Sequence, residues 1–281
     1  MTENLNIVIN PIGVVRTSMK NPEDVPIPGQ PGQVEIFPQY SRGLFRIEEN
    51  SHIWLQLWFH KSDRSCLSTV PRRVNPNLPE YGVFGLRSPN RPNPIALCLV
   101  HLDSVDGNIL NVHGLDAIDG TPVLDIKSYY EQDIVFSPKT PYIRPLNPVM
   151  RRAIFMKEAL AHHQEECPDL FMAVRMALVA DEYMGHLNRP DLKLTVTGSA
   201  CLADTLQGLS RARLANPPRL SFHDSATLTA SVWEQPGRSL RITALRILNQ
   251  ETFTELSDEE LFHIELDELN SLTRKGNLIN E

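Results

Sequence analysis

The sequence predicts an all-β barrel at the N-terminus, followed by an α+β domain at the C-terminus. Short runs of alternating apolar and polar residues, separated by turn residues, dominate the first half of the chain. Four prolines within residues 138–148 mark the end of this half. Beyond them, two long stretches show the apolar spacing of amphipathic helices. We therefore expect a barrel domain at residues 1–140, a stiff proline-rich linker at 141–149 and an α+β domain at 150–281.

The clearest strand of the first half is predicted at residues 52–60. Apolar residues alternate there with polar and ring-bearing ones, and large rings occur on both faces. This strand should therefore be buried on both sides or border a pocket. Further strands are expected at residues 7–15, 34–36, 95–102, 109–113 and 123–126, with one or two helical turns at 40–47. Strands this short favour a barrel, and no G-x-G-x-x-G motif indicates a dinucleotide-binding fold.

The second half is expected to mix helices with strands. Helices are predicted at residues 149–163, 170–187 and 201–214, the last preceded by the start signal Gly198-Ser199. Strands are predicted at residues 192–197, 220–222, 227–233 and 240–248, with a turn at Pro236-Gly237. A capping box at residues 257–260 predicts an acidic terminal helix.

Composition limits the classes of function. The net charge is −7, so a nucleic-acid partner would need a local basic patch, for which Arg72, Arg73, Arg87 and Arg91 are the best candidates. The N-terminus lacks the pattern of a signal peptide, and no apolar run is long enough for a membrane span. The four cysteines show no disulfide or zinc-finger spacing. We expect a cytoplasmic protein.

Two motifs carry the candidate chemistry of the first half. Residues 85–95 hold three prolines and the arginines Arg87 and Arg91, which indicates a rigid loop suited to phosphate or carboxylate recognition. The alternative is a stiff surface loop with solvated arginines. The second motif is the tight acidic turn Asp119-Gly120-Thr121, which could bind a small ligand or could simply form a hairpin corner. Asp125 and Lys127 beyond this turn are expected to form a structural ion pair.

These motifs resemble the TrmO (YaeB-like) family over residues 11–144. The matching segments include Pro11-Ile-Gly-Val-Val-Arg-Thr17, Phe59-His60, Arg87-Ser-Pro89, Arg91-Pro-Asn-Pro-Ile95 and Asp119-Gly-Thr-Pro-Val123. The resemblance implies a small β-barrel that uses S-adenosylmethionine to methylate N6 of threonylcarbamoyl-adenosine at tRNA position 37. Because methyl transfer depends largely on proximity and orientation, no catalytic residue is assigned.

The resemblance also implies which residues form the sites. The cofactor pocket falls on Pro28, Gly29, Gln30, Phe59, His60, Arg87, Leu97, Asp119, Gly120 and Thr121. Three positions depart from the family, since Gly29 stands where relatives often have arginine, and Ala96 and Cys98 replace a glycine and a serine. Arg91 and Asn93 are expected to bind tRNA phosphate or the threonylcarbamoyl carboxylate, or alternatively to brace their loop. Family barrels place the cofactor near a subunit interface, so a homodimer is expected, with Trp54 and Trp58 offering apolar surface.

Residues 150–248 resemble the FmdE family, which is named after a component of formylmethanofuran dehydrogenase. The matching motifs are His163-Gln-Glu-Glu-Cys167-Pro168 and Cys201-Leu-Ala-Asp204, with Glu165 in place of the family's second histidine. Zinc at His163, Cys167 and Cys201 is one expectation, and two buried cysteines beside a surface histidine are the other. On one helix, His163 and Cys167 would share a face, although Pro168 could start a new helix there. At a helix N-terminus, the Cys201 thiol should have a lowered pKa.

Three functions are compatible with these features. The first is methylation of tRNA adenosine. The second keeps the cofactor but takes a small-molecule acceptor, and the third is a metal- or ligand-binding sensor without catalysis. Outside these sites, Cys66 is expected to be a loop thiol and Cys98 a core residue.

Overall fold

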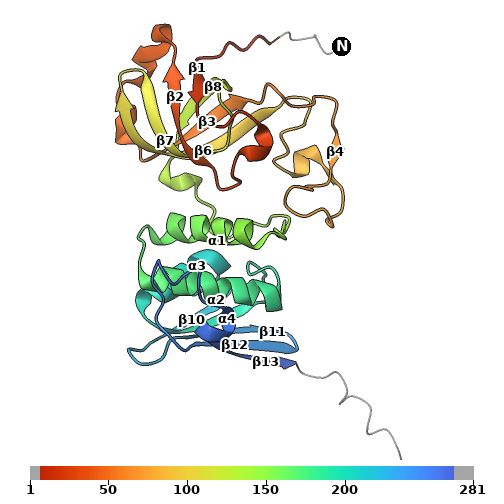
Figure 1. Ribbon diagram of the computed structural model, residues 1–281, viewed down its shortest axis with the longest axis vertical. Coiled ribbons are helices and arrows are strands. Elements are labelled where there is room, and N and C mark those ends of the chain that lie inside the picture. Colours follow the sequence, from red (N-terminus) through yellow and green to blue (C-terminus); the bar gives the residue numbers. More distant parts are fainter. Residues whose placement is uncertain (1–6, 269–281) are drawn as a thin grey trace, which may run out of the picture. The chain divides into compact units, whose positions relative to one another are not determined.

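The computed structural model describes residues 7–268, which form two compact units (Figure 1). Unit 1 contains the chain up to Val135 together with Ile143–Asn147. Unit 2 contains Phe136–Tyr142 and the chain from Pro148 onward. The proline-rich stretch is therefore divided between the two units.

Unit 1 is a closed antiparallel barrel, as the sequence predicts. Its strand order is β1-β2-β7-β6-β3-β8, and every neighbouring pair is antiparallel. Closure leaves no barrel strand with an unpaired edge. The barrel strands are β1 (Gly13–Arg16), β2 (Gln30–Ile36), β3 (His52–Trp58), β6 (Ile95–Asp106), β7 (Ile109–Leu115) and β8 (Pro122–Ser128).

The alternation predicted for β3 is confirmed. Ile53, Leu55 and Leu57 are fully buried inside the barrel, where each contributes about 1.5–3 kcal/mol by leaving water. Trp54 and Trp58 lie on the outer face and are half-buried. The first strand is shorter than predicted, because pairing begins only where Gly13 meets Ile36 and Val123.

Short elements connect the barrel strands. A two-stranded sheet pairs β4 (Ser68–Thr69) with β5 (Tyr81–Gly82) inside the long connection from β3 to β6. The helical turns expected near residues 40–47 are present as 3₁₀ helices η2 and η3. The short helices of this unit are η1 (Pro22–Asp24), η2 (Pro38–Leu44), η3 (Ile47–Glu49), η4 (Val83–Gly85) and η5 (Glu131–Asp133).

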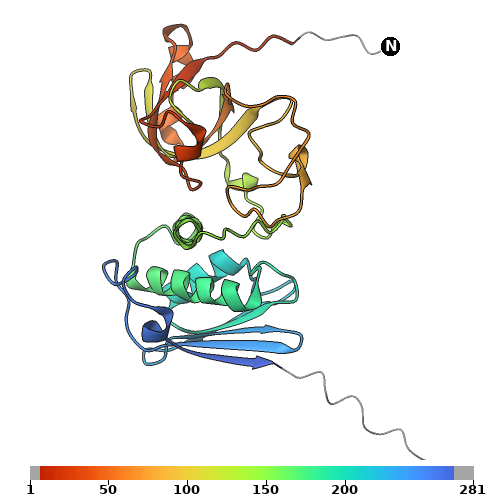
Figure 2. The ribbon, with the colours of Figure 1, turned by 45° about the vertical axis from the view of Figure 1, so that its right-hand side comes forward.

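Unit 2 is a five-stranded sheet with helices on one face. The sheet order is β10-β9-β11-β12-β13, and only the β10–β9 pair is parallel. Figures 1 and 2 show α2 and α3 against the sheet, with α1 packed on these two helices. No helix within residues 7–268 is long and apolar enough to cross a membrane. The elements are α1 (Pro148–His163), α2 (Pro168–Met184), β9 (Lys193–Gly198), α3 (Ala200–Ser210), β10 (Leu220–Asp224), β11 (Ala230–Gln235), β12 (Arg238–Ala244), α4 (Asp258–Leu261) and β13 (Phe262–Glu268).

The acidic terminal helix predicted from residue 257 onward is wrong as far as the described residues reach. The capping box is present at Ser257, but α4 ends after four residues and the chain continues as β13. The apolar residues Phe262, Ile264 and Leu266 alternate with polar ones, and this period of two matches a strand. Pairing with β12 over seven residue pairs outweighs the local helix signal. The rest of the predicted helix lies outside the described residues.

Position 29 requires a glycine, because its backbone closely approaches the backbone of Gly114 in β7. Its φ is +85°, and an added Cβ would lie 2.4 Å from the backbone carbonyl of Gly114. Gly107 also has a positive φ, of +61°, but open space surrounds its Cβ position. This backbone geometry explains why the chain has glycine where relatives often have arginine.

These two glycines give a matched stability test. Gly107→Ala should lower the free energy of unfolding by about 1–2 kcal/mol, the cost of the left-handed conformation for a residue with a Cβ. Gly29→Ala should lower it clearly more, because the backbone at Gly114 must also move. Urea unfolding of both variants measures the difference. Equal losses would show that the contact at Gly114 relaxes without cost.

Candidate functional site

A cavity of about 700 Å³ lies at one end of the barrel in unit 1. Its walls come from segments that follow β1, β3 and β7 and from the loop that precedes β6. Because neighbouring barrel strands are antiparallel, these segments meet at the same end. We call this space the loop-end cavity. Its size falls within the range of about 300–1,000 Å³ that is typical of small-ligand sites.

Four residues of the predicted cofactor set line the loop-end cavity, namely Phe59, His60, Arg87 and Thr121. The other six, Pro28, Gly29, Gln30, Leu97, Asp119 and Gly120, are not part of its lining. Gln30 supports the wall indirectly, since its buried Nε2 donates to the carbonyl of Ala117, which does line the cavity.

Four basic side chains border the loop-end cavity, but they differ in how they are held. Lys61 donates to the carbonyl of Lys20 at 2.9 Å, and Arg73 donates to the carbonyls of Pro22 and Val25. Within residues 7–268, the guanidinium groups of Arg72 and Arg87 make no hydrogen bond or ion pair. These two arginines are therefore available to an anionic ligand.

Arg91 braces the proline-rich loop, which is the alternative role that its sequence allows. Its guanidinium donates to the carbonyls of Ser88 at 2.8 Å, Val83 at 2.7 Å and Leu86 at 2.5 Å. The loop is thereby fixed around Arg87. Asn93 is exposed in the same loop. Substrate binding by Arg91 and Asn93 stays a prediction.

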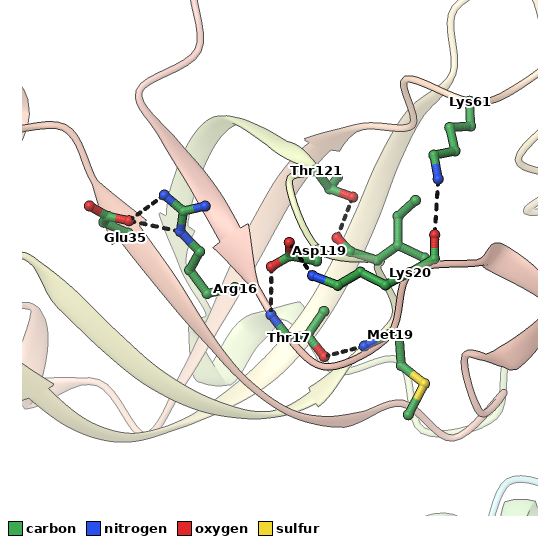
Figure 3. A network of polar contacts seen from close by, with 9 residues as sticks. Arg16, Thr17, Met19, Lys20, Glu35, Lys61, Asp119 and Thr121 are labelled. Carbon is green, nitrogen blue, oxygen red and sulfur yellow. Dashed lines mark hydrogen bonds and ion pairs between the residues drawn. The ribbon is translucent and has the colours of Figure 1, made fainter.

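The Asp119-Gly120-Thr121 turn closes the barrel between β1 and β8. The Gly120 N–H donates to the carbonyl of Val15, whose own N–H donates to the carbonyl of Thr121. The Thr121 hydroxyl donates to the carbonyl of Ile118 at 2.7 Å (Figure 3). The turn is thus a structural corner, and Thr121 also contributes to the cavity wall.

Asp119 ties the segment after β1 to this turn. Its carboxylate accepts from the ammonium of Lys20 at 2.7 Å and from the Thr17 N–H at 3.2 Å, as Figure 3 shows. The Lys20 contact and, second, the Thr17 hydrogen bond hold the pKa of Asp119 below its usual value. The expected ion pair between Asp125 and Lys127 is confirmed at 2.7 Å on the exposed barrel surface.

Leu97 lies on the outer face of the barrel. It is 47% exposed, and the neighbouring Ile95 is 39% exposed. The β3–β6 register places Trp58 opposite Ile95 and Gln56 opposite Leu97, so the outer face carries several apolar side chains with Gln56 among them. Cys98, which points the other way, is a buried core residue as predicted, and Cys66 is a partly exposed thiol in the loop after β3.

The sequence interpretation missed the segment at residues 69–74 as part of the cavity wall. This segment contains Pro71, Arg72 and Arg73, and all six of its residues line the loop-end cavity. The hydrogen bonds of Arg73 to the segment at residues 22–25 hold it in place. The available signal is a proline beside two adjacent arginines, which by itself predicts only a basic patch.

A second cluster lies in unit 2 and consists of His163, Cys167 and Cys201. Their ligand atoms all lie within 4.8 Å of one another. His163 is the last residue of α1, and the chain turns at Gln164, whose φ is +62°. Cys167 then caps α2, with its sulfur accepting from the Leu170 N–H. The expectation that His163 and Cys167 share one helix face is therefore wrong, and Pro168 does start a new helix.

The expected lowering of the Cys201 pKa is also wrong. Cys201 lies in the first turn of α3, but burial raises the pKa of its thiol, and the nearby Cys167 and Asp169 raise it further. The side chain of Ser199 caps this helix by accepting from the Leu202 N–H at 3.1 Å. Desolvation is the largest cause of the raised pKa of this thiol.

Gly208 allows α1 to approach α3 closely. An added Cβ at Gly208 would lie 2.5 Å from the ring of His162. One turn earlier on α3, the carboxylate of Asp204 contacts His162 Nε2 at 3.2 Å and His163 Nδ1 at 2.8 Å. The cluster therefore depends on how these two helices pack.

Comparisons with known proteins find relatives chiefly of the barrel unit. The fold defines a small-barrel protein with a ligand-sized site at its loop end. Residues 14–133 match the family model described as the tRNA-methyltransferase O N-terminal domain. An S-adenosyl-L-methionine-binding protein from Archaeoglobus fulgidus is 42% identical over 127 residues, covering 44% of this chain and 89% of that protein. The chain belongs to the tRNA-methyltransferase O family.

Other relatives match different shares of the chain. A second Archaeoglobus fulgidus protein, described as a probable S-adenosyl-L-methionine-binding protein, is 34% identical over 221 residues, covering 75% of this chain and 60% of its own length. This match is longer than unit 1, so it extends into unit 2. A mouse tRNA (adenine(37)-N6)-methyltransferase is 36% identical over 135 residues, which cover 44% of this chain and 31% of the enzyme. The crystal structure of TrmO from Pseudomonas aeruginosa is 20% identical and covers 87% of this chain and 95% of its own, with a TM-score of 0.42 that is too low to bear on the site.

The ion pair at the barrel corner leads to a titration test. Lys20→Gln should raise the pKa of Asp119 toward its ordinary value, because the largest cause of the lowered pKa is lost. In the wild type, the stabilisation from this pair is present above the unfolded-state pKa and is lost as pH falls through the folded-state pKa. Carbon-13 NMR of the aspartate carboxyls follows the shift. Lys127→Gln, at the Asp125 pair, is the control and should leave Asp119 unchanged.

Proposed function

We propose that unit 1 binds S-adenosylmethionine in the loop-end cavity and transfers its methyl group to N6 of threonylcarbamoyl-adenosine at tRNA position 37. The observation that carries this proposal is the convergence of Phe59, His60, Arg87 and Thr121, which are far apart in sequence, on one cavity. Curated members of the same family are named as S-adenosyl-L-methionine-binding proteins or tRNA (adenine(37)-N6)-methyltransferases.

The cavity offers a distinct contact for each part of the cofactor. The ring of Phe59 provides an aromatic face for the adenine, and the unpaired guanidinium of Arg87 suits the carboxylate of the methionine part. The acceptor nitrogen attacks the methyl carbon, the bond from sulfur to that carbon breaks, and S-adenosylhomocysteine leaves. The nitrogen then releases its proton to water. Because the sulfonium is already a strong electrophile, alignment of the two reactants supplies most of the rate.

The distribution of positive charge supports a tRNA acceptor despite the net charge of −7. Lys61, Arg72, Arg73 and Arg87 all border the loop-end cavity, which forms a local basic patch. Basic side chains at such a place position the phosphate backbone of a nucleic acid without reading its sequence. We assign Arg72 this role, since its guanidinium has no partner among the described residues.

The arginines give a direct binding test. Arg87→Ala should weaken S-adenosylmethionine binding by about 1–3 kcal/mol, the scale of a lost hydrogen bond to a charged group, which corresponds to a dissociation constant about 5- to 150-fold higher. Arg72→Ala should leave cofactor binding unchanged. Isothermal calorimetry measures both, with Lys127→Ala as a control outside the cavity. No binding by the wild type would remove the methyltransferase proposal altogether.

The acceptor is tested by a transfer assay. The full-length protein is incubated with methyl-labelled cofactor and tRNA from a strain in which the gene is deleted, and the nucleosides are analysed by mass spectrometry. Label in N6-methyl-threonylcarbamoyl-adenosine supports the proposal, and Arg72→Ala should then raise the tRNA concentration needed for half-maximal rate. Label only in a small molecule of a cell extract would support the second function. Cofactor binding without any transfer would support a sensor.

For unit 2, we infer an FmdE-like domain from the motif around His163 and Cys167 and from the motif around Cys201. The relative whose match extends into unit 2 supports a shared two-unit organisation, with a barrel unit followed by this domain. The zinc expected from this resemblance is independent of methylation. Its three ligands belong to unit 2, while every residue that lines the loop-end cavity belongs to unit 1.

We infer further that the barrel forms a homodimer through the outer face of β3 and β6. The apolar patch of Trp54, Trp58, Ile95 and Leu97 supports this inference, because a second copy would cover it symmetrically. In such a dimer, Leu97 would contribute at the subunit interface, where family barrels place the cofactor.

The dimer is tested by one charge in the patch. Leu97→Glu should give a monomer at micromolar concentration, because a buried unpaired carboxylate is costly at an apolar interface. Phe45→Glu changes an equally apolar, 84% exposed residue outside the patch and should leave the dimer intact. Light scattering reports the mass of each variant. A monomeric wild type that retains full activity would exclude this assembly.

A further inference from the structure

We propose that Phe84, at the rim of the loop-end cavity, stacks on a nucleobase beside the adenosine that is methylated. This inference rests on the proposed function and deepens it, because it names the part of the tRNA that the rim holds. Phe84 is 78% exposed, although phenylalanine is among the residues most often buried in proteins. Single exposed rings are common on protein surfaces. What sets Phe84 apart is how it is held and which groups surround it.

The backbone of Phe84 is fixed on both sides. Its neighbour Val83 is fully buried and donates its N–H to the carbonyl of Leu67 at 3.0 Å. The guanidinium of Arg91 donates to the carbonyls of Val83 at 2.7 Å and Leu86 at 2.5 Å, which lie before and after Phe84. These contacts hold η4 and keep the exposed ring at one place on the surface. Less conformational entropy is therefore lost when a partner binds to the ring.

Phe84 directly precedes residues that line the loop-end cavity. Leu86 and Arg87 both belong to the cavity wall, and the two residues from Phe84 to Leu86 span at most about 7 Å even when extended. The surface beside the ring is open, since an added Cβ at Gly85 would meet no atom within 4 Å. A base next to one that enters the cavity is therefore within reach of the ring.

The surroundings of the ring favour a nucleic acid over an apolar protein partner. The guanidinium groups of Arg72 and Arg87 at the adjoining cavity have no partner within residues 7–268. Positive side chains that follow the phosphate backbone, together with an aromatic ring on which a base stacks, are the usual means of binding single-stranded nucleic acid. The core of an interface with another protein is instead depleted of most charged residues.

Stacking on Phe84 offsets part of the cost of turning out the target base. A base on which an enzyme acts leaves its stack, and its neighbours then lose a stacking partner. The Phe84 ring offers a face to one of these neighbours while the adenosine enters the loop-end cavity. Every base has such a face, so the contact positions the RNA without reading its sequence. Phe84 thus contributes to tRNA binding and has no contact with the cofactor.

Replacement of the ring tests the proposal. The probe is an anticodon stem-loop RNA with adenosine at position 37, and fluorescence anisotropy follows its binding to the full-length protein. Phe84→Ala should raise the dissociation constant about 5- to 150-fold, the effect of losing one stack between a base and an aromatic ring. Phe84→Trp should bind at least as well as the wild type. Phe84→Leu keeps the apolar character without the ring and should bind nearly as weakly as Phe84→Ala, so wild-type affinity in Phe84→Leu would overturn the stacking role.

Three controls separate this effect from others. Phe45→Ala removes a ring that is 84% exposed near the end of the barrel where β3 begins, opposite to the loop-end cavity, and should leave RNA binding unchanged. Calorimetry should give Phe84→Ala the wild-type dissociation constant for S-adenosylmethionine, which shows that the variant is folded and its cavity intact. Light scattering should give it the wild-type mass. A lower mass would assign the ring to contact with a second copy of the chain and overturn the proposal.

Photochemical cross-linking measures the contact in the wild type. 5-Iodouridine at position 36 or 38 of the stem-loop reacts on irradiation with an aromatic ring that is stacked on it, and mass spectrometry identifies the attached residue. At least one of these two positions should cross-link to Phe84. Cross-links only to other residues, such as Trp54 on the outer face of the barrel, or no cross-link at all, would exclude the proposed stack.

The same variants distinguish a failure of this proposal from a failure of the proposed function. In the expected case, Phe84→Ala raises the KM for tRNA and leaves kcat at saturating tRNA nearly unchanged. A wild type that methylates tRNA, with the same KM in Phe84→Ala, would uphold the function and overturn the stacking role. A wild type that binds the stem-loop through Phe84 but transfers no methyl group to tRNA would uphold the stacking role and overturn the proposed acceptor.

Discussion

Closure of the barrel at the seam between β1 and β8 is the constraint on which unit 1 depends. The two strands share only a short register, so the seam relies on the hydrogen bonds that Gly120 and Thr121 exchange with Val15. The same turn places Thr121 in the cavity wall and, through Asp119, ties down the segment that follows β1. One group of contacts thus sets both barrel closure and cavity shape. The polar groups of the Asp119-Gly120-Thr121 motif are therefore already hydrogen-bonded within the barrel, although the motif borders the cavity.

The two arginines of the proline-rich loop have different roles, although they look equivalent in the sequence. Arg91 gives its hydrogen bonds to three carbonyls of the loop, and Arg87 is held at the cavity with its donors free. Prolines remove backbone donors, so a loop of this kind cannot stabilise itself through its own N–H groups. The guanidinium of Arg91 supplies the missing donors, so the loop is already held in place before a ligand binds.

The sequence predicted the barrel and most strand positions, because alternation is a local signal. The three-residue cluster in unit 2 was predicted only through the resemblance of its motifs to a known family. It failed where distant partners decide the outcome. β13 follows a good helix start, yet it pairs with β12, and the choice depends on a sheet edge that is remote in the chain. The contact of His163 with Asp204 and the cavity role of residues 69–74 are likewise set by tertiary packing. Gly29 shows the reverse case, in which a departure from the family pattern is explained by a backbone contact.

The close approach of α1 to α3 at Gly208 has a consequence for recognising this kind of domain in other sequences. Asp204 and Gly208 are one turn apart and so lie on the same face of α3. The glycine admits the ring of His162, and the aspartate then reaches both histidines. A larger residue at position 208 would separate the helices even if both cysteines were kept. Recognition of such a cluster in another sequence therefore depends on an aspartate and a glycine four residues apart as well as on the histidine and the two cysteines.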